Sequence, residues 1–311
     1  MAGSGKMAEN LGFFFLQKGY PVHWLSHSPA RLLPLKTKIE QTKKRMQRFF
    51  PEKSRSFSAS VSTYDAPIPQ PDIIIETSVE SLAHKQQIFA SLAHLTNDQT
   101  LLLTNSSSIL PHTIHPRCLG AHFFYPVQLT EILEFISSDP DHPLSGQALR
   151  FFRDNTLEVI QQDERNAFLI NRLLLPLQAA CLHALRDGFT PEEIDAASQS
   201  SLMGMGQLSL IRSISVDLVA TAVRHYQSLP GSLPQPDFPR FLADLALLDH
   251  APSPETPPRT TVSDRDRLQR HLHLIFTDSC RQAVERKLIG AGQLKTVLAD
   301  IFHAPLDSSF F

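Results

Sequence analysis

Cysteine is scarce in this sequence. Its 311 residues include three cysteines, Cys118, Cys181 and Cys280, an odd and scattered set that does not form a disulfide framework. A reducing, cytoplasmic environment is therefore expected. Cys181 and Cys280 fall within apolar helical patterns, which predicts that both thiols are buried core residues.

Clustered charge and long apolar runs are also missing. Lys and Arg number 29 against 31 Asp and Glu, a net charge of −2 with no block of one sign. This balance argues against nucleic acid or an anionic membrane as a partner. No apolar run reaches the roughly 18 residues that span a bilayer, and the opening residues lack the apolar core of a secretion signal. We therefore expect a soluble protein.

What is present is enough apolar sequence for two domains, 42% of the chain against 19% charged residues. Up to residue 163, helical and strand patterns alternate. The run at 72–76, Asp-Ile-Ile-Ile-Glu, is apolar on both faces, as a buried parallel strand is. Further strands are expected at 22–25, 100–104, 119–124 and 157–160, and helices after residue 5, over 31–50 and over about 80–95. This alternation predicts a Rossmann-type, doubly wound α/β domain over residues 1–163.

The second part of the chain, residues 164–311, has helical patterns alone. They cover 168–185, 191–226, 241–248, 263–288 and 293–302. Two proline-rich stretches, 229–240 and 251–260, are expected to be loops. The coarse prediction is an all-α second domain.

A glycine-rich motif opens the chain. Gly3-Ser4-Gly5-Lys6-Met7-Ala8 fits G-x-G-x-x-[GA], in which the glycines allow a tight turn and close approach of a dinucleotide pyrophosphate to a helix N-terminus. A lone match of this kind also fits a flexible N-terminus. The residues predicted to bind the cofactor here are Gly3, Gly5, Lys6 and Met7.

Two features depart from the usual dinucleotide-binding pattern. Only Met1 and Ala2 precede the motif, so the first strand of the sheet is expected to be truncated. Ser26 takes the position at which an acidic residue holds the ribose hydroxyls. Because His27 or Arg31 could favour a 2′-phosphate, NADP stays open beside NAD.

Four further runs carry more specific information. They are Val79-Glu80-Ser81-Leu82 with Lys85; Thr104-Asn105-Ser106-Ser107-Ser108; Gly120-Ala121-His122-Phe123-Phe124-Tyr125-Pro126 with Glu134; and Phe168-Leu169-Ile170-Asn171-Arg172-Leu173. In this order and spacing, the set resembles the 3-hydroxyacyl-CoA dehydrogenase family, within the 6-phosphogluconate dehydrogenase C-terminal-like superfamily. The family's patterns read V-E-x-L, S-N-T-S-S, G-x-H-F-F-N-P and F-I-x-N-R-L. The resemblance covers about residues 3–226 and is that of a divergent member.

The residues themselves favour alcohol oxidation. This reaction needs a base for the hydroxyl proton, and imidazole suits that task near neutral pH. His122 lies at the carboxyl end of a predicted strand, where open α/β sheets bind ligands. Glu134, twelve positions later, could hold the ring tautomer and stabilise the imidazolium. The alternatives are a structural histidine and, for Glu134, a solvated helix residue.

The resemblance implies more about the site. It implies an NAD(P)-dependent interconversion of a 3-hydroxyacyl-CoA and its 3-oxoacyl form, within fatty acid metabolism, with His122 as base and Glu134 as its partner. Ser107 and Asn171 would hydrogen-bond the substrate oxygens. Ser26, Glu80, Lys85 and Asn105 would lie at the cofactor. The second domain would complete the substrate site and form a homodimer.

Departures from the family pattern leave a second hypothesis open. Tyr125 replaces the asparagine after His-Phe-Phe, and only fourteen residues separate Ser107 from His122. The chain could therefore be a degenerate member, weakly active or inactive, that serves as a binding or assembly module.

Two other groups of residues have the composition of possible sites. His112, His115 and Cys118 are spaced as metal ligands could be, but prolines at 111 and 116 interrupt the helix that would align them, so no metal site is predicted. The basic residues within 36–48 are expected to form a solvated helix face; by resemblance they could instead contact CoA phosphates.

Overall fold

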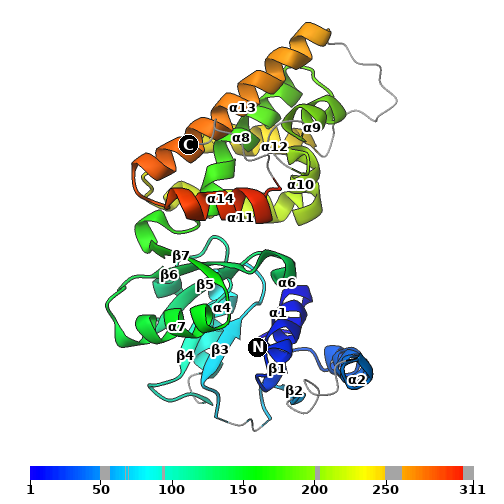
Figure 1. Cartoon of the computed structure of the whole chain (residues 1–311), viewed down its shortest axis with the longest axis vertical. Coiled ribbons are helices and arrows are strands. Elements are labelled where there is room, and N and C mark those ends of the chain that lie inside the picture. The colour runs from blue at the N-terminus through cyan, green and yellow to red at the C-terminus, as the bar shows by residue number, and fades with distance from the viewer. Residues whose placement is uncertain are drawn as a thin grey trace. The chain divides into compact units, whose positions relative to one another are not determined.

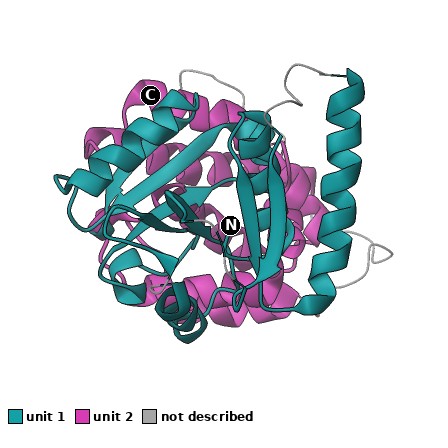
Figure 2. Cartoon of the chain, turned by 90° about the horizontal axis from the view of Figure 1, so that it is seen from below, with its two compact units in different colours: residues 1–164 teal, residues 165–311 magenta. Residues whose placement is uncertain are grey.

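A computed structural model describes residues 1–49, 57–66, 68, 70–92, 95–199, 204–248 and 261–303. The chain divides into two compact units, Met1–Glu164 and Arg165–Phe311 (Figure 2). The boundary predicted from the sequence lies one residue earlier. The expected proline-rich loop at 251–260 lies outside the described residues.

The first unit alternates helices and strands as the sequence pattern predicts (Figure 1). Its strands are β1 (Val22–Ser26), β2 (Ala59–Thr63), β3 (Ile73–Glu76), β4 (Leu101–Thr104), β5 (Cys118–Phe123), β6 (Ile132–Ser137) and β7 (Glu158–Asp163). Its helices are α1 (Lys6–Gln17), η1 (Pro29–Arg31), α2 (Leu32–Phe49), α4 (Leu82–Leu92), α5 (Pro111–Ile114), α6 (Val127–Thr130) and α7 (Pro143–Asp154). Strands β2 and β6 and helices α5, α6 and α7 were not predicted from the sequence.

The strands pair in the order β2-β1 and β3-β4-β5-β6-β7. Strands β3, β4 and β5 run parallel, and apart from the partly buried Ile73 their apolar residues are buried, as expected for a sheet covered on both faces. Strand β6 runs antiparallel to β5, and β7 follows β6 in parallel. The Rossmann-type α/β fold is confirmed, with an antiparallel step that the sequence pattern did not reveal.

One residue joins the two groups of strands. Ala2 forms parallel bridges to both Leu25 of β1 and Glu76 of β3. The Ala2 N–H donates to the Ile75 carbonyl at 2.9 Å, and the Gly3 N–H donates to the Leu25 carbonyl at 2.9 Å. Ala2 therefore lies between β1 and β3, where the first strand of the sheet was expected.

Helix α1 packs closely on β1, which positions the glycine motif. Gly12 faces the Trp24 ring so closely that a Cβ atom at position 12 would lie 2.0 Å from Trp24 Cζ2. The Trp24 indole N–H donates to the Ala8 carbonyl at 2.9 Å and is fully buried. These contacts place the N-terminus of α1 beside the carboxyl end of β1.

In its described residues, the second unit consists of helices and the loops between them. After the short turn η3 (Glu164–Asn166), its helices are α8 (Leu169–Arg186), α9 (Pro191–Gln199), α10 (Gln207–Ile214), α11 (Val216–Ser228), α12 (Phe238–Leu247), α13 (Val262–Glu285) and α14 (Ala291–Asp300). The predicted helical region 191–226 is thus three helices. Helices α12 and α13 pack on α8, the central helix of this unit.

Within the described residues, one helical stretch, Glu164–Arg186, is long and apolar enough to cross a membrane by length and composition. Two thirds of its most apolar window (67%) is buried inside the protein. That is the burial expected of a core helix.

Candidate active site

His122 and Glu134 meet across the antiparallel pair of strands β5 and β6. They are direct register partners, so their side chains leave the same face of the sheet. His122 Nδ1 lies 2.9 Å from Glu134 Oε2, with 7% of His122 and none of Glu134 exposed. The alternative of a solvated helical residue at position 134 is therefore wrong.

This contact selects one tautomer of the neutral imidazole. The carboxylate oxygen accepts a hydrogen bond from Nδ1–H, and in this tautomer the basic lone pair is on Nε2. When the ring takes up a proton, the same carboxylate stabilises the imidazolium. The pair has the arrangement that a general base requires.

A serine-rich loop, residues 105–109, follows β4 and lies beside the end of β5. We call it the serine loop. Asn105 Oδ1 accepts a hydrogen bond from the Phe123 N–H at 3.0 Å, which ties the loop to the residue after His122. The Asn105 N–H donates to the Glu76 carbonyl at 2.7 Å. Ser107 therefore sits on a loop held to both neighbouring strands.

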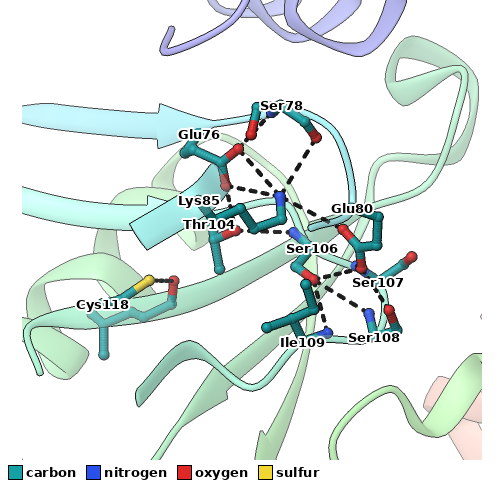
Figure 3. A network of polar contacts seen from close by, with 11 residues as sticks. Glu76, Ser78, Glu80, Lys85, Thr104, Ser106, Ser107, Ser108, Ile109 and Cys118 are labelled. Carbon is teal, nitrogen blue, oxygen red and sulfur yellow. Dashed lines mark hydrogen bonds and ion pairs between the residues drawn. The ribbon is translucent and has the colours of Figure 1, made fainter. Parts of the chain in front are cut away.

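Glu80 holds the serine loop from the other side (Figure 3). Its Oε1 atom accepts hydrogen bonds from Ser106 Oγ at 2.7 Å, from the Ser107 N–H at 3.1 Å and from Ser108 Oγ at 2.7 Å. Burial by itself would raise the pKa of Glu80, but the nearby Lys85 ammonium and these hydrogen bonds outweigh it and hold the pKa below its ordinary value.

Lys85 is buried between two carboxylates. Its Nζ atom lies 3.0 Å from Glu76 Oε2 and 3.5 Å from Glu80 Oε2. The Lys85 and Glu76 side chains are 1% and 0% exposed. Thr104 Oγ1 donates to Glu76 Oε2 at 2.7 Å.

The glycine motif forms the turn that a dinucleotide requires. Gly3 has a φ of +143°, and a Cβ atom there would lie 2.5 Å from Thr77 Oγ1, so only glycine fits. Gly5 precedes α1 as its N-cap without a side-chain cap hydrogen bond. The backbone N–H groups of the first helical turn are therefore available to an anion. The residues present fit the pyrophosphate of a dinucleotide.

Lys6, Met7 and Ser26 lie beside this turn. Lys6 and Met7 form the first turn of α1. Ser26, at the end of β1, has its Oγ 2.8 Å from Ser4 Oγ. Lys6 Nζ lies 4.3 Å from the centre of the Tyr125 ring, a cation–π distance. Tyr125, which replaces the asparagine of the family pattern, is half exposed and contacts Lys6 of the glycine motif.

Known protein families match both units of the chain. Residues 1–149 match the NAD binding domain of 3-hydroxyacyl-CoA dehydrogenase, and residues 168–250 match its C-terminal domain. The chain belongs to the 3-hydroxyacyl-CoA dehydrogenase family. The cofactor of the matched N-terminal domain is NAD.

Several relatives and solved structures are similar to this chain. A 3-hydroxybutyryl-CoA dehydrogenase of Clostridioides difficile is 32% identical over 158 residues, 48% of this chain and 56% of the relative. A probable 3-hydroxybutyryl-CoA dehydrogenase of Bacillus subtilis is 27% identical, over 70% of this chain and 80% of the relative. Among solved structures, FadB2 of M. tuberculosis has a TM-score of 0.65 at 22% identity and covers 80% of this chain and 92% of its own. It shares the fold. The chain spans about half the length of the first curated relatives it matches, 56% and 54%.

The fourth motif of the family lies in the second unit. Asn171 is near the start of α8, and its Nδ2 donates to the Tyr226 hydroxyl of α11 at 3.0 Å. Because Asn171 and His122 belong to different units, a joint role for them stays a prediction. The expected hydrogen bond between Ser107 and the substrate also stays a prediction.

Four polar residues of the site were quoted from the sequence only as members of longer runs and were given no role there: Glu76, Thr104, Ser106 and Ser108. They surround the family residues Glu80 and Lys85 in one buried network. One signal pointed to Glu76, since an acidic residue that ends a wholly apolar strand needs a buried partner.

The remaining candidates have other contacts. His112 pairs with Glu164, and the His115 ring stacks on Phe89 with 6.0 Å between ring centres. In the part of the chain that the structure describes, no group of three or more His, Cys, Asp or Glu could hold a metal ion. Cys181 and Cys280 are fully buried, as predicted, and burial raises the pKa of Cys280 to about 12. The basic residues within 36–48 lie on α2 and are mostly exposed.

Proposed function

We propose that this chain is an NAD-dependent 3-hydroxyacyl-CoA dehydrogenase that interconverts a 3-hydroxyacyl thioester and its 3-oxoacyl form. The observation that carries the proposal is the 2.9 Å contact between His122 Nδ1 and Glu134 Oε2 at the carboxyl end of β5. Membership of the family and the fit of the glycine motif to a dinucleotide support it.

In this reaction, oxidation of the alcohol removes a proton from the 3-hydroxyl oxygen and a hydride from C3. NAD, when bound, supplies the hydride acceptor. The proton passes to His122 Nε2, and Glu134 keeps the ring oriented and stabilises the imidazolium. In the reverse direction, the imidazolium returns this proton to the oxygen of the 3-oxo group.

The chain's other groups bind and orient. The turn at Gly3 and Gly5 and the first turn of α1, with Lys6 and Met7, would hold the pyrophosphate. Ser26 would face the adenosine ribose. Ser107 and Asn171 would hydrogen-bond the substrate oxygens, and the second unit would carry the acyl chain and form a homodimer in the cytoplasm.

The direct test is reduction of acetoacetyl-CoA by NADH. Wild-type protein should oxidise NADH in proportion to the thioester consumed, and His122→Gln should abolish turnover while its fold is retained. His142→Gln, an exposed histidine of the same unit, is the matched control and should keep wild-type activity. Undiminished turnover in H122Q would remove His122 from the mechanism.

A second candidate is a degenerate member that acts as a binding or assembly module. It is motivated by Ser26 and Tyr125, which depart from the family pattern, and by a cavity of about 540 Å³ beside Met1, lined by β1 and β3 residues such as Val22 and Ile73. Titration with NADH and NADPH, followed by fluorescence, separates the two candidates. The enzyme binds a dinucleotide at micromolar concentration, whereas the module binds neither.

A further inference from the structure

The side-chain amide of Asn171 is held by a tyrosine of another helix. Asn171 lies in the first turn of α8, and its Nδ2 donates to the hydroxyl oxygen of Tyr226, in the last turn of α11, at 3.0 Å. Only 3% of Tyr226 is exposed. An asparagine amide can turn either its oxygen or its nitrogen toward a neighbour, and this hydrogen bond puts the nitrogen on the side of Tyr226. One of the two orientations of the amide is therefore selected.

The ring of Tyr226 packs against two residues that flank Asn171. Its centre lies 6.0 Å from the centre of the Phe168 ring and 5.9 Å from Arg172 Cζ, which is within cation–π range. Residues three and four positions apart lie on one face of a helix, so Phe168, Asn171 and Arg172 contact Tyr226 from the same face at the start of α8. These contacts fix the place of the Tyr226 hydroxyl relative to Asn171.

Arg172 is itself anchored by the backbone that follows α11. Its Nη1 donates to the Pro230 carbonyl at 2.6 Å, and 2% of Arg172 is exposed. Gly231 lies so close that a Cβ atom there would be 1.9 Å from Arg172 Nη1, so this chain segment closes directly on the guanidinium. The end of α11 and the start of α8 are therefore joined twice, at the Tyr226 hydroxyl and at the Pro230 carbonyl.

We propose that Tyr226 is a positioning residue for Asn171: its hydroxyl holds the amide in the orientation in which Nδ2 donates to a substrate oxygen. This inference rests on the proposed function, because it takes Asn171 to hydrogen-bond the substrate. A substrate oxygen accepts hydrogen bonds, and within the amide only Nδ2 donates them. Since Nδ2 carries two hydrogens, it can serve Tyr226 and a substrate oxygen together.

Removing the hydroxyl alone tests this role. Tyr226→Phe keeps the ring and its contacts with Phe168 and Arg172 but leaves the Asn171 amide without this acceptor. The kcat/KM for acetoacetyl-CoA should fall about tenfold, because a small misplacement of a binding group is costly. The Kd for NADH should change by less than about twofold. A loss of NADH affinity as large as the loss of kcat/KM would show a general disturbance of the protein and overturn the proposal.

The chain offers a closely matched control in the first unit. The Tyr20 hydroxyl also accepts from an asparagine Nδ2, that of Asn155, at 3.0 Å. Tyr20→Phe therefore removes the same kind of hydrogen bond away from the candidate site and should keep the wild-type kcat/KM. If Y226F and Y20F have the same kinetics, the Tyr226 hydroxyl does not position Asn171.

Two variants of Asn171 test whether Tyr226 acts through this residue. Added to Asn171→Ala, Tyr226→Phe should lower kcat/KM little beyond the effect of Asn171→Ala alone, whereas effects that multiply would contradict the proposal. Asn171→Gln keeps the amide but moves it by one methylene group, so its kcat/KM should fall nearly as far as that of N171A. Wild-type kcat/KM in N171Q would show that the amide needs no fixed position, and this test does not depend on the folding of Y226F.

Binding of the thioester without turnover keeps this inference distinct from the proposed function. In calorimetric titrations with acetoacetyl-CoA alone, N171A and Y226F should each raise the Kd, and the double variant should differ about threefold or more from the product of the two effects. This result in a protein that does not oxidise NADH would retain the role of Tyr226 and reject the dehydrogenase. Normal turnover and an unchanged thioester Kd in Y226F would retain the dehydrogenase and overturn the role of Tyr226.

Discussion

Glu134 is twelve residues from His122 along the chain but directly opposite it across the β5–β6 ladder, with 2.9 Å between Oε2 and Nδ1. Strands fix this relationship, since register partners in an antiparallel pair have their side chains on one face. The imidazole of His122 and the carboxylate of Glu134 are therefore both carried by strands of the sheet and not by loops.

Replacing this carboxylate tests its part in the reaction. Glu134→Gln keeps the shape but removes the charge that stabilises the imidazolium and selects the tautomer. We expect kcat for acetoacetyl-CoA reduction to fall by about 10²- to 10⁴-fold. Glu131→Gln, at a half-exposed carboxylate beside β6, is the control and should retain kcat. Equal kcat in E134Q and wild type would show that His122 works without Glu134.

The sequence predicted the residues of this pair but not the strand that joins them. All six residues of β6 are buried, so Ile132–Ser137 has no alternation of apolar and exposed positions to mark a strand. The resemblance, rather than periodicity, connected Glu134 to His122. Similarly, β2 has the composition Ala-Ser-Val-Ser-Thr and is only partly buried, which leaves little hydrophobic signal.

The contacts within the buried polar network around Glu80 and Lys85 could not be predicted from the sequence either. Glu76, Glu80 and Lys85 are all visible in the sequence, yet their pairing depends on how α4 turns back over β3. Spacing along the chain does not give the direction of a side chain after a turn. The parallel strands β3 and β4, whose signal is simply continuous apolar sequence, were predicted within one residue at each end.

Acid should destabilise the protein partly through Glu80. Because its pKa is held below its ordinary value in the folded chain, the folded state binds this proton less readily than the unfolded state. Its stabilising contribution is present above the ordinary glutamate pKa and is lost as the pH falls through the lowered folded pKa. Urea unfolding from about pH 6 to about pH 3 should show a steeper loss for wild type than for Glu80→Gln. Parallel pH profiles would contradict this.

The packing of α1 on β1 predicts a sharp steric effect. In Gly12→Ala, the new Cβ atom would lie 2.0 Å from Trp24 Cζ2, so the helix or the ring must shift. We expect a loss of about 1–3 kcal/mol in the free energy of unfolding. Gly146→Ala in α7 is the matched control: its nearest neighbour is Arg150 Nη1 at 3.5 Å, and removing a helical glycine should stabilise by about 0.5–1 kcal/mol. Thermal unfolding of the two variants should move in opposite directions.

From Ser26 we derive a prediction about how the site discriminates between NADH and NADPH. It ends β1 beside Ser4, at the position where an acidic residue would hold the ribose hydroxyls and repel a 2′-phosphate. Placing a carboxylate there with Ser26→Asp should lower kcat/KM for NADPH relative to NADH by about tenfold or more, because the new charge faces the phosphate. Ser91→Asp, which adds the same charge at an exposed position on α4, controls for net charge and should leave the ratio unchanged. The measurement is the ratio of kcat/KM for the two cofactors with acetoacetyl-CoA. An unchanged ratio in S26D would mean that the adenosine ribose does not lie at the end of β1.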